Sequence, residues 1–355
     1  MQKYGSLKIA WHSDKLKSLK EEKITAPIYV RIKPTNKCNH RCFYCAYDPQ
    51  FGYILSERFN RADEIPREKM MEILKDFHEI GVKAITYSGG GEPLFYPYIL
   101  ETLKKTLEYG IDLSVITNGQ NLKGEIAETL SNAQWVRISL DSNNPKTFSE
   151  TRGVPPEFFD ELIENIKNFA RIKNPSCEFG INFVVNEKNA LSVYDSVKFF
   201  RDLGVNHIKI TPLYTPKGFV EYHAPFKREV IEQIKKAKQE LETDSFAIFD
   251  TYENDFLLSS TSTRNYKKCF MMQVVPVIAA DSAVYFCHDK AYSNSGLLGS
   301  IKERSFKDLW FSEEAAEIFK KFNPQESCKH HCTADARNLF INDALSCYGE
   351  HINFI

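Results

Sequence analysis

The stretch Glu79-Ile80-Gly81-Val82, which runs on into Ala84-Ile85-Thr86-Tyr87-Ser88, gives the clearest indication of the fold. An amphipathic helix pattern ends at a glycine, which takes a left-handed cap conformation at little cost. A short apolar run typical of a buried parallel strand follows. Because the same pattern recurs around Gly110 and Gly204, the sequence predicts repeated strand and helix units in a parallel sheet.

The neighbouring segments fit the same rhythm. Apolar runs predict six strands, over 28–32, 84–88, 113–117, 136–140, 179–185 and 207–211. Amphipathic runs predict helices over 67–79, 98–108, 156–171, 191–203 and 227–242. We therefore expect an α/β fold in which residues 26–243 form a partial (β/α)6 barrel of the TIM type, after an N-terminal extension over 1–25.

The strand and helix rhythm stops near residue 243, where we expect a domain boundary. Residues 244–355 carry five of the nine cysteines, with short strands expected over 274–279 and 283–286 and a helix over 313–322. The sequence therefore predicts a smaller C-terminal α+β domain whose cysteines bind a metal centre.

Charge and apolar patterning limit the partners and the compartment. Lys and Arg (46) nearly balance Asp and Glu (47), so charge favours neither nucleic acid nor a membrane as a partner. We expect a cytoplasmic protein, because the sequence shows neither a signal-peptide core nor an apolar run of membrane length. Thiols stay reduced in that compartment, so clustered cysteines indicate metal binding or catalysis.

Three clustered cysteines, Cys38, Cys42 and Cys45, directly follow the first expected strand in a Cys-x3-Cys-x2-Cys loop. Such a loop can hold three corners of a cuboidal iron–sulfur cluster, for which thiolates are the usual ligands. Three thiolates on four irons leave one iron open to another ligand. The alternatives are a zinc site that includes His40, or three reduced thiols in a loop.

The triad and the turns after the next strands resemble the radical S-adenosylmethionine (SAM) superfamily over about residues 28–214. The resemblance implies a 4Fe–4S cluster whose open iron binds SAM and reduces it to a 5′-deoxyadenosyl radical. The turn over 88–93 is similar to the Gly-Gly-Glu motif of the family. By the same resemblance, the expected SAM contacts are Tyr44, Gly90, Gly91, Glu92, Thr117, Asn118, Ser139 and Arg152.

Polar residues on or after further strands are the expected substrate contacts, because parallel barrels place their chemistry at the carboxyl ends of strands. We expect Asp141, Arg137 and His207 in this role. A single histidine on a strand is more often a core residue, so that alternative stays open for His207.

The C-terminal cysteines resemble the twitch domain, the shortened form of the SPASM extension of radical SAM enzymes. The resemblance implies an auxiliary 4Fe–4S cluster with the ligands Cys269, Cys287, Cys328 and Cys332. A zinc site built from Cys328 and Cys332 with His330 or His331 is the alternative. Of the two remaining thiols, Cys177 is expected to be a small buried apolar residue. Cys347 is a spare thiol, a replacement ligand or a hydrogen-atom donor, and of these we favour the spare thiol.

We therefore expect a radical SAM oxidoreductase or epimerase that takes hydrogen from a small molecule, a carbohydrate or a sugar nucleotide. Family analogy implies a reduced flavodoxin or ferredoxin as electron donor. A peptide maturase is the second hypothesis, although about 25 residues before the first strand are too few for a leader-peptide domain. A non-catalytic zinc-binding interaction protein is the third.

Overall fold

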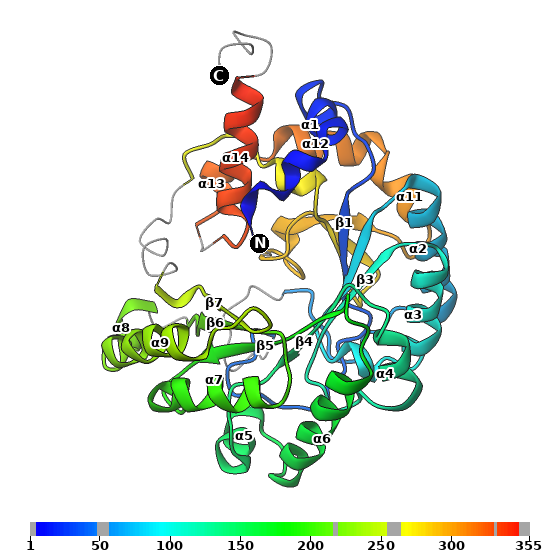
Figure 1. Ribbon diagram of the computed structural model, residues 1–355. Helices are drawn as coiled ribbons and strands as arrows, with labels where there is room; N and C mark the ends of the chain where they lie inside the picture. Colours follow the sequence, from blue (N-terminus) through cyan, green and yellow to red (C-terminus); the bar gives the residue numbers. More distant parts are fainter. Residues whose placement is uncertain (1–4, 48–56, 216–218, 254–263, 330–331, 348–355) are drawn as a thin grey trace.

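The computed structural model describes residues 5–47, 57–215, 219–253, 264–329 and 332–347. In this part of the chain one sheet of ten strands, in the order β10-β9-β8-β1-β2-β3-β4-β5-β6-β7, curves around an interior with helices on its outer side (Figure 1). The strands are β1 (Tyr29–Ile32), β2 (Ala84–Tyr87), β3 (Asp112–Thr117), β4 (Trp135–Ser139), β5 (Glu178–Val185), β6 (His207–Pro212), β7 (Ala247–Asp250), β8 (Val277–Ile278), β9 (Ala283–Tyr285) and β10 (Leu297–Ser300).

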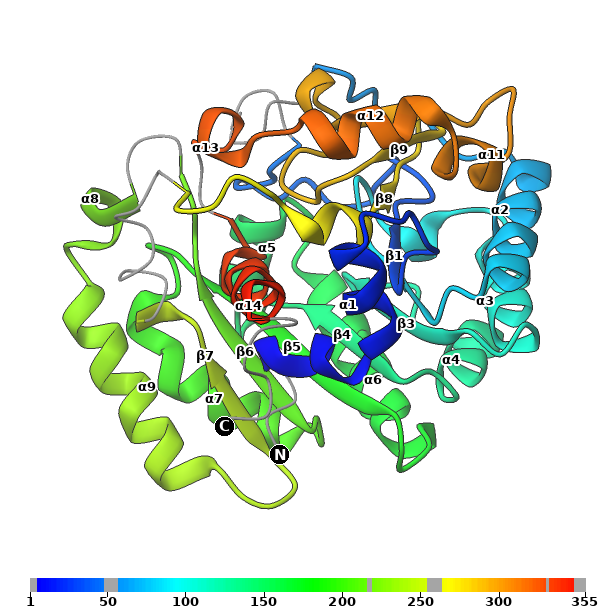
Figure 2. The same cartoon turned by 90° about the horizontal axis from the view of Figure 1, so that it is seen from above.

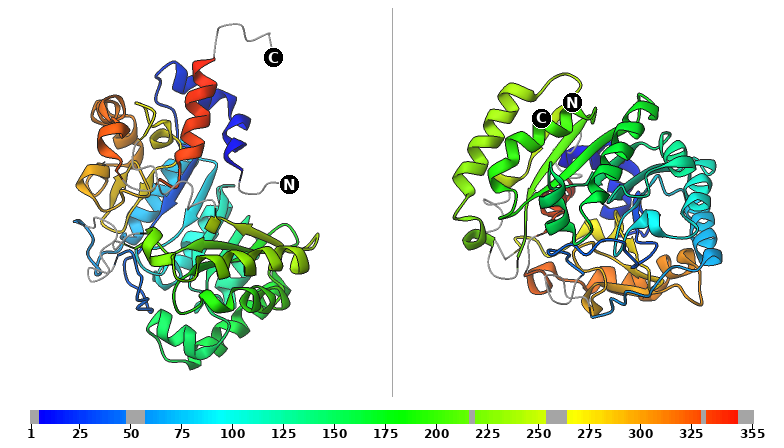
Figure 3. Two further views of the ribbon diagram at one scale, coloured as in Figure 1. Left: turned by 90° about the vertical axis from the view of Figure 1, so that its left-hand side faces the viewer. Right: turned by 90° about the horizontal axis from the view of Figure 1, so that it is seen from below.

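The barrel helices lie around the outside of the sheet, as the view from below shows (Figure 3). They are α2 (Arg67–Ile80), α3 (Ile99–Glu108), α4 (Gly124–Leu130), α5 (Pro145–Arg152), α6 (Glu157–Ile172), α7 (Val193–Asp202), α8 (Phe219–His223) and α9 (Lys227–Leu241). The others are α1 (Ser13–Lys20), α11 (Phe306–Trp310), α12 (Glu313–Lys321), α13 (Pro324–Ser327) and α14 (Asp335–Ser346). Of these, α1 and α14 lie in the middle of the view from above (Figure 2). The partial TIM-type barrel predicted from the sequence is confirmed.

The helix-to-strand pattern works as expected at Gly81. This residue caps α2 with φ 83°, and its N–H donates to Phe77 O at 3.0 Å. The chain then enters β2, whose Ile85 and Tyr87 are fully buried in the main core. The glycine therefore stops the helix at the point where the buried strand must begin.

A seventh parallel strand, β7, continues the barrel beyond the six that the sequence predicts. His207 of β6 pairs with Ala247, and Ile208 with Ile248. The expected boundary near residue 243 therefore falls before the last barrel strand. The sequence misses β7 because it has only four residues and follows a polar turn closed by Thr243 and Phe246, without the glycine that precedes β2, β3 and β6.

The C-terminal region extends the same sheet from its other edge. Ile278 of β8 pairs in parallel with Ile32 of β1, and β9 and β10 add antiparallel strands. The two short strands expected from the sequence are present as the antiparallel pair β8 and β9, and β8 is joined to β1, the barrel strand that precedes the cysteine triad. This junction places the C-terminal cysteines close to the barrel.

The two ends of the described chain pack against each other. Figure 2, seen from above, shows α14 end-on beside η1 (Ser6–Trp11) and α1. Ile9 and Leu19 share a hydrophobic cluster with Ile341 and Leu345. Among the described helices, none combines the length and apolar character that crossing a membrane requires.

Candidate active site

The loop with the three cysteines leaves β1 and is held by the end of α5. Arg41 N donates to Arg152 O at 2.8 Å, and Phe43 N donates to Thr151 O at 3.2 Å. A Cβ on the next residue, Gly153, would lie 2.4 Å from Arg41 O, so only glycine permits this close approach. Helix α5 therefore fixes the backbone on which the cysteines stand.

The glycine-rich turn after β2 packs on the residues just before Cys38. Gly91 N donates to Thr35 O and Glu92 N to Lys37 O, both at 2.9 Å. A Cβ at Gly91 would lie 2.1 Å from Lys37 O. The turn and the cysteine loop are thus locked together.

One cavity of about 310 Å³ brings the predicted residues together. This volume lies within the range of small-molecule sites. All three thiols of the triad line the cavity, and Cys38 interacts electrostatically with Cys42 and Cys45. Every predicted SAM contact lines it as well: Tyr44, Gly90, Gly91, Glu92, Thr117, Asn118, Ser139 and Arg152.

Glu92 is buried in the wall of this cavity. One carboxylate oxygen accepts from Leu94 N at 2.9 Å and from the Thr117 hydroxyl, and the other accepts from Asn118 N at 2.7 Å. Burial raises the pKa of Glu92 to about 7, against these three hydrogen bonds. A carboxylate offers about four acceptor positions, so one stays open for a cationic ligand group.

Asp141, Arg152 and Tyr44 form a buried network beside the cysteine loop. Arg152 donates from Nη2 to Asp141 at 2.7 Å and from Nη1 towards the sulfur of Cys42 at 3.5 Å. The Tyr44 hydroxyl also donates to Asp141, and Val184 N donates to its other oxygen at 3.0 Å. Both oxygens of Asp141 are therefore engaged within the protein, whereas Nε of Arg152 is buried with no hydrogen-bond partner in the described chain.

Arg137 and His207 lie on the inner face of the barrel. Their neighbours Val136 and Ile208 are fully buried in the core on the helix side, so alternation turns Arg137 and His207 inwards. Neither they nor Asp141 line the cavity. Arg137 lies close to it, however, because it precedes the cavity residue Ser139 by two positions on β4 and pairs with the cavity residue Ile116 of β3.

The His207 ring is buried against β5. A Cβ at Gly180 would lie 2.2 Å from His207 Nε2, so the missing side chain makes room for the imidazole. His207 Nδ1 lies 3.9 Å from Glu178 Oε2, and its ring meets the edge of Phe249 at 5.6 Å. The role of His207 as a substrate contact stays a prediction.

The structure gathers the four C-terminal thiols expected to bind the auxiliary cluster. Cys269 interacts electrostatically with Cys328 and Cys332, and Cys287 interacts with Cys269 and Cys332. Burial raises the pKa of Cys269 to about 12 and that of Cys332 to about 11. The neighbouring thiols add to the shift of Cys269, and Asp289 adds to that of Cys332. The thiolate is the metal-binding form. Cys328 is buried and the other three thiols are partly buried. Four cysteines are the usual ligands of a 4Fe–4S cluster, so this donor set fits an iron–sulfur group.

The remaining predictions concern the zinc alternative and the thiols Cys177 and Cys347. Within the described residues, no three His, Cys, Asp or Glu side chains lie close enough together to hold a single metal ion. A cuboidal cluster binds each thiolate to a different iron, so its ligands lie further apart than those of one ion. His330 and His331, which the zinc alternative needs, lie outside the described residues. Cys177 is buried as expected, and Cys347 is exposed just after α14.

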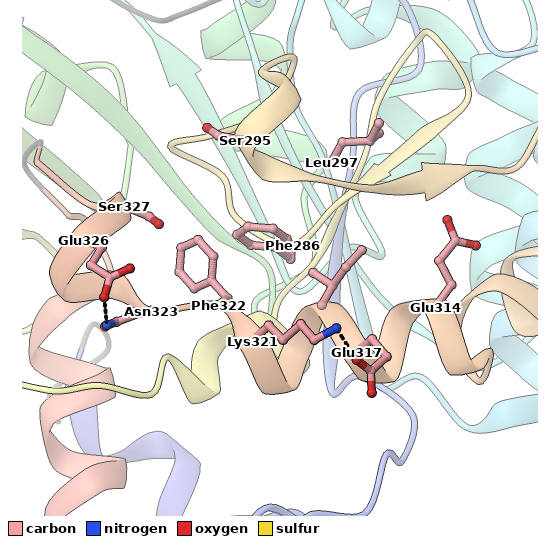
Figure 4. Close-up of a pocket in the computed structure, with 11 residues that line it drawn as sticks. Phe286, Ser295, Leu297, Glu314, Glu317, Lys321, Phe322, Asn323, Glu326 and Ser327 are labelled. Atoms are coloured by element: carbon pink, nitrogen blue, oxygen red, sulfur yellow. Dashed lines mark hydrogen bonds and ion pairs between the residues drawn. The ribbon is translucent and has the colours of Figure 1, made fainter.

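A second cavity, of about 570 Å³, lies on the outer side of the C-terminal region between β10 and α12 (Figure 4). Phe286 and Phe322 form its apolar part, with ring centroids 4.7 Å apart. Lys321 pairs with Glu317 at the edge. No residue predicted for the active site lines it.

Some residues of the site carry no motif and were missed in the sequence. Asn36, Tyr47 and Phe59 line the main cavity. Lys33 is fully buried and donates to Tyr47 Oη at 2.7 Å and to Gly89 O at 2.6 Å. Arg31 lies between the core residues Val30 and Ile32, so alternation turns it and Lys33 towards the interior of the barrel. The strand pattern in the sequence could therefore have identified Lys33 as an interior residue. Asn36, Tyr47 and Phe59 give no such signal.

Comparison with known proteins identifies the family. A family model for the radical SAM superfamily matches residues 32–190, which hold the triad and the glycine-rich turn. The chain belongs to the radical SAM superfamily. A second model, SPASM, described as an iron–sulfur cluster-binding domain, matches residues 269–333. This radical SAM protein is therefore an enzyme, with a C-terminal SPASM-type domain.

The two domains imply the cofactors of the protein. The radical SAM domain implies a 4Fe–4S cluster and SAM, and the SPASM domain implies auxiliary iron–sulfur binding. The thiol sets described above fit these groups. That the auxiliary site holds a single cluster stays a prediction.

Two curated relatives of this radical SAM enzyme are named probable GTP 3′,8-cyclase. The protein of Thermococcus kodakarensis is 29% identical over 216 residues, which are 60% of this chain and 65% of the relative. That of Saccharolobus islandicus is 30% identical over 217 residues, which are 58% of this chain and 64% of the relative. The match thus spans less than two thirds of either relative's length.

Solved structures support the fold. SuiB of Streptococcus suis, bound to S-adenosylmethionine, has a TM-score of 0.65 at 17% identity, over 93% of this chain and 74% of that chain. The protein anSMEcpe with bound AdoMet has a TM-score of 0.59 at 21% identity, over 91% of this chain and 96% of that chain.

Proposed function

We propose that this radical SAM enzyme takes a hydrogen atom from a carbohydrate that carries an anionic group, such as a sugar nucleotide, and that the outcome is dehydrogenation or epimerisation. The observation that carries the proposal is the single cavity that joins the three thiols to all the expected SAM contacts. The basic side chains on the inner face of the barrel support an anionic carbohydrate as the substrate.

Cys38, Cys42 and Cys45 would hold the first cluster, and Glu92 and Arg152 would bind SAM. The open acceptor position of Glu92 suits the methionine ammonium, and the unpartnered Nε of buried Arg152 suits the carboxylate. When bound, the cluster and SAM supply the 5′-deoxyadenosyl radical that abstracts hydrogen. The protein has to orient the two partners and keep water out.

Basic side chains support an anionic substrate. Arg31, Arg137 and Lys209 all lie on the inner face, because their strand neighbours pack in the core on the other side. A guanidinium recognises phosphate through paired hydrogen bonds. The name of the two curated relatives, probable GTP 3′,8-cyclase, also points to a nucleotide.

The C-terminal thiols support the oxidation outcome. A substrate radical becomes a carbonyl compound by losing one electron and one proton. Cys269, Cys287, Cys328 and Cys332 would hold the group that accepts the electron. Reduced flavodoxin or ferredoxin is the proposed donor to the first cluster.

The test is anaerobic turnover of the reconstituted enzyme with SAM and reduced flavodoxin. We expect a sugar nucleotide to raise 5′-deoxyadenosine formation at least about tenfold over the substrate-free rate, and a substrate deuterated at its reacting carbon to pass deuterium into that product. Stimulation by a peptide alone, with every sugar nucleotide inert, would overturn the proposed substrate class in favour of a peptide maturase.

A further inference from the structure

We propose that Tyr292, in the SPASM-type domain, is a positioning residue that holds the glycine-rich SAM turn in place through Asn36. The inference rests on the proposed function, which assigns this turn to SAM. It adds that the loop carrying the auxiliary thiol Cys287 sets the affinity for SAM.

The contact is direct and buried. The Tyr292 hydroxyl donates to Asn36 Oδ1, and Asn36 Nδ2 donates to Asn60 O at 2.8 Å. Asn36 is 1% exposed. A Cβ at Gly90 would lie 2.0 Å from Asn36 Oδ1 and 2.6 Å from Tyr292 Oη. The glycine of the turn therefore rests on both the amide and the hydroxyl.

The backbone of Tyr292 is unusual and firmly held. Its φ of 64° lies in the left-handed region, which bulky residues rarely adopt. Such strain persists only where the surroundings impose it, and it clusters at functional sites. Here Arg58 N donates to Tyr292 O at 3.0 Å.

The ring of Tyr292 packs on the cavity wall. It meets Tyr47 edge-on at 5.6 Å and Phe59 edge-on at 5.2 Å, and both of these residues line the SAM cavity. Tyr292 therefore supports the cavity by ring packing and the glycine-rich turn by its hydroxyl.

The same loop carries an auxiliary thiol. Cys287 and Tyr292 both lie in the segment between β9 and β10. A metal group held by Cys287 would restrain this loop, and with it the hydroxyl that supports Asn36. Coupling of this kind is reciprocal, so SAM binding would also stabilise the loaded auxiliary site.

Removal of the hydroxyl tests the contact with Asn36, although Ala280 N, which donates to the same hydroxyl at 3.4 Å, loses its acceptor too. In Tyr292→Phe the ring packing remains, but Asn36 Oδ1 loses its donor inside the protein. A buried acceptor without a partner favours rearrangement, so we expect the turn to shift and the SAM dissociation constant to rise about tenfold.

Tyr285→Phe is the matched control. Tyr285 is also fully buried, and its ring centroid lies 5.8 Å from that of Tyr292. Its hydroxyl, however, donates to Asp281 at 2.7 Å and accepts from Arg58 Nε at 3.1 Å, and neither partner belongs to the turn. A hydroxyl lost from the same aromatic cluster should therefore leave SAM affinity unchanged.

The experiment measures SAM affinity of the reduced holoenzyme from the change in its electron paramagnetic resonance spectrum, with iron content and unfolding temperature measured in parallel. Tenfold weaker binding in Tyr292→Phe alone, at equal iron content, supports the inference. Equal affinity in both variants overturns it while the proposed function stands. A wild-type enzyme that does not bind SAM removes the proposed function itself.

Cys287→Ala provides a second test that does not alter Tyr292. We expect this variant to lose the auxiliary iron, keep the first cluster and bind SAM several-fold more weakly. Wild-type affinity in the absence of the auxiliary iron would overturn the coupling.

Discussion

Asp141 and Arg152 are a buried ion pair whose charge matters for both stability and the site. Their side chains are 0% and 5% exposed. Arg152 also reaches Cys42 and the cavity, so the carboxylate of Asp141 keeps the guanidinium oriented towards the cluster loop. We interpret Asp141 as a group that positions Arg152, which differs from the substrate contact expected from the sequence.

Asp141→Asn should lower the free energy of unfolding of the metal-free protein by about 3 kcal/mol, because it leaves a buried guanidinium without a counter-charge. Urea denaturation measures this. The control is Glu161→Gln, which breaks a pair with Lys123 of equal length, 2.7 Å, whose side chains are 43% and 58% exposed. The control should cost less than about 1 kcal/mol. Equal costs for the two variants would contradict a structural role for the buried pair.

At this scale the sequence predicts the groups that carry chemistry better than the groups that support them. The triad spacing and the turns after strands identify residues that then share one cavity. Asn36 and Tyr292 are 256 positions apart, and their contact depends on the folded chain. No local pattern of residues reports such a contact.

Strands β5 and β6 show how one missing side chain shapes the barrel interior. Gly180 and His207 are directly paired across the two strands. The space at Gly180 is filled by the imidazole, which is 3% exposed. The two residues thus form one packing unit on the inner face.

Gly180→Ala should lower the free energy of unfolding by about 2 kcal/mol, because the new methyl group overlaps the His207 ring. In the His207→Ala background the same change should cost well under about 1 kcal/mol, since the ring is gone. A double-mutant cycle by urea denaturation measures the difference. If Gly180→Ala cost the same in both backgrounds, the overlap would not be its cause.

For elements, the sequence predicts those with a strong local signal. The strands that follow a glycine-capped helix are found to within one or two residues, as β2 and β3 show. Strand β7 is missed because nothing local marks it. The pairing of β8 with β1 joins segments about 246 residues apart, as in Arg31 with Val277, and local periodicity carries no information on it.

At the scale of the whole molecule, helix α1 packs against helix α14, close to the two ends of the described chain. Lys15 of α1 is 6% exposed and donates to Thr25 O, Thr25 Oγ1 and Ala26 O at 3.0 to 3.2 Å. Burial lowers its pKa to about 8 from 10.5. Packing of the ends could not be predicted from sequence, because Ile9 and Ile341 meet only in the folded protein.

Lys15 gives stability a pH dependence of known sign. Between pH 8 and 10.5 the unfolded chain holds a proton that the folded chain has lost, so stability rises with pH. From pH 7.5 to 9.5 we expect the unfolding free energy of the wild type to rise by about 2 kcal/mol relative to Lys15→Met. Urea denaturation at the two pH values measures this. A constant difference between the two proteins would contradict it.

If the barrel triad and the C-terminal thiols each hold one cluster, the iron content of the protein is the sum of the two. We expect about eight irons per reconstituted wild-type chain and about four in Cys42→Ala or in Cys287→Ala. Iron and sulfide analysis measures them, with the buried Cys177→Ser as a thiol control that keeps the full content. About four irons in the wild type would remove the auxiliary cluster.

The most direct test is reductive cleavage of SAM by the oxygen-free, reconstituted protein, followed as 5′-deoxyadenosine. The wild type should form this product only with SAM and a strong reductant together, and Cys42→Ala should lower the rate at least about a thousandfold, because the cluster loses a ligand. Wild-type protein with its iron in place that leaves SAM intact, or a Cys42→Ala variant that cleaves it at the wild-type rate, would contradict the assignment of the triad to the radical-generating site.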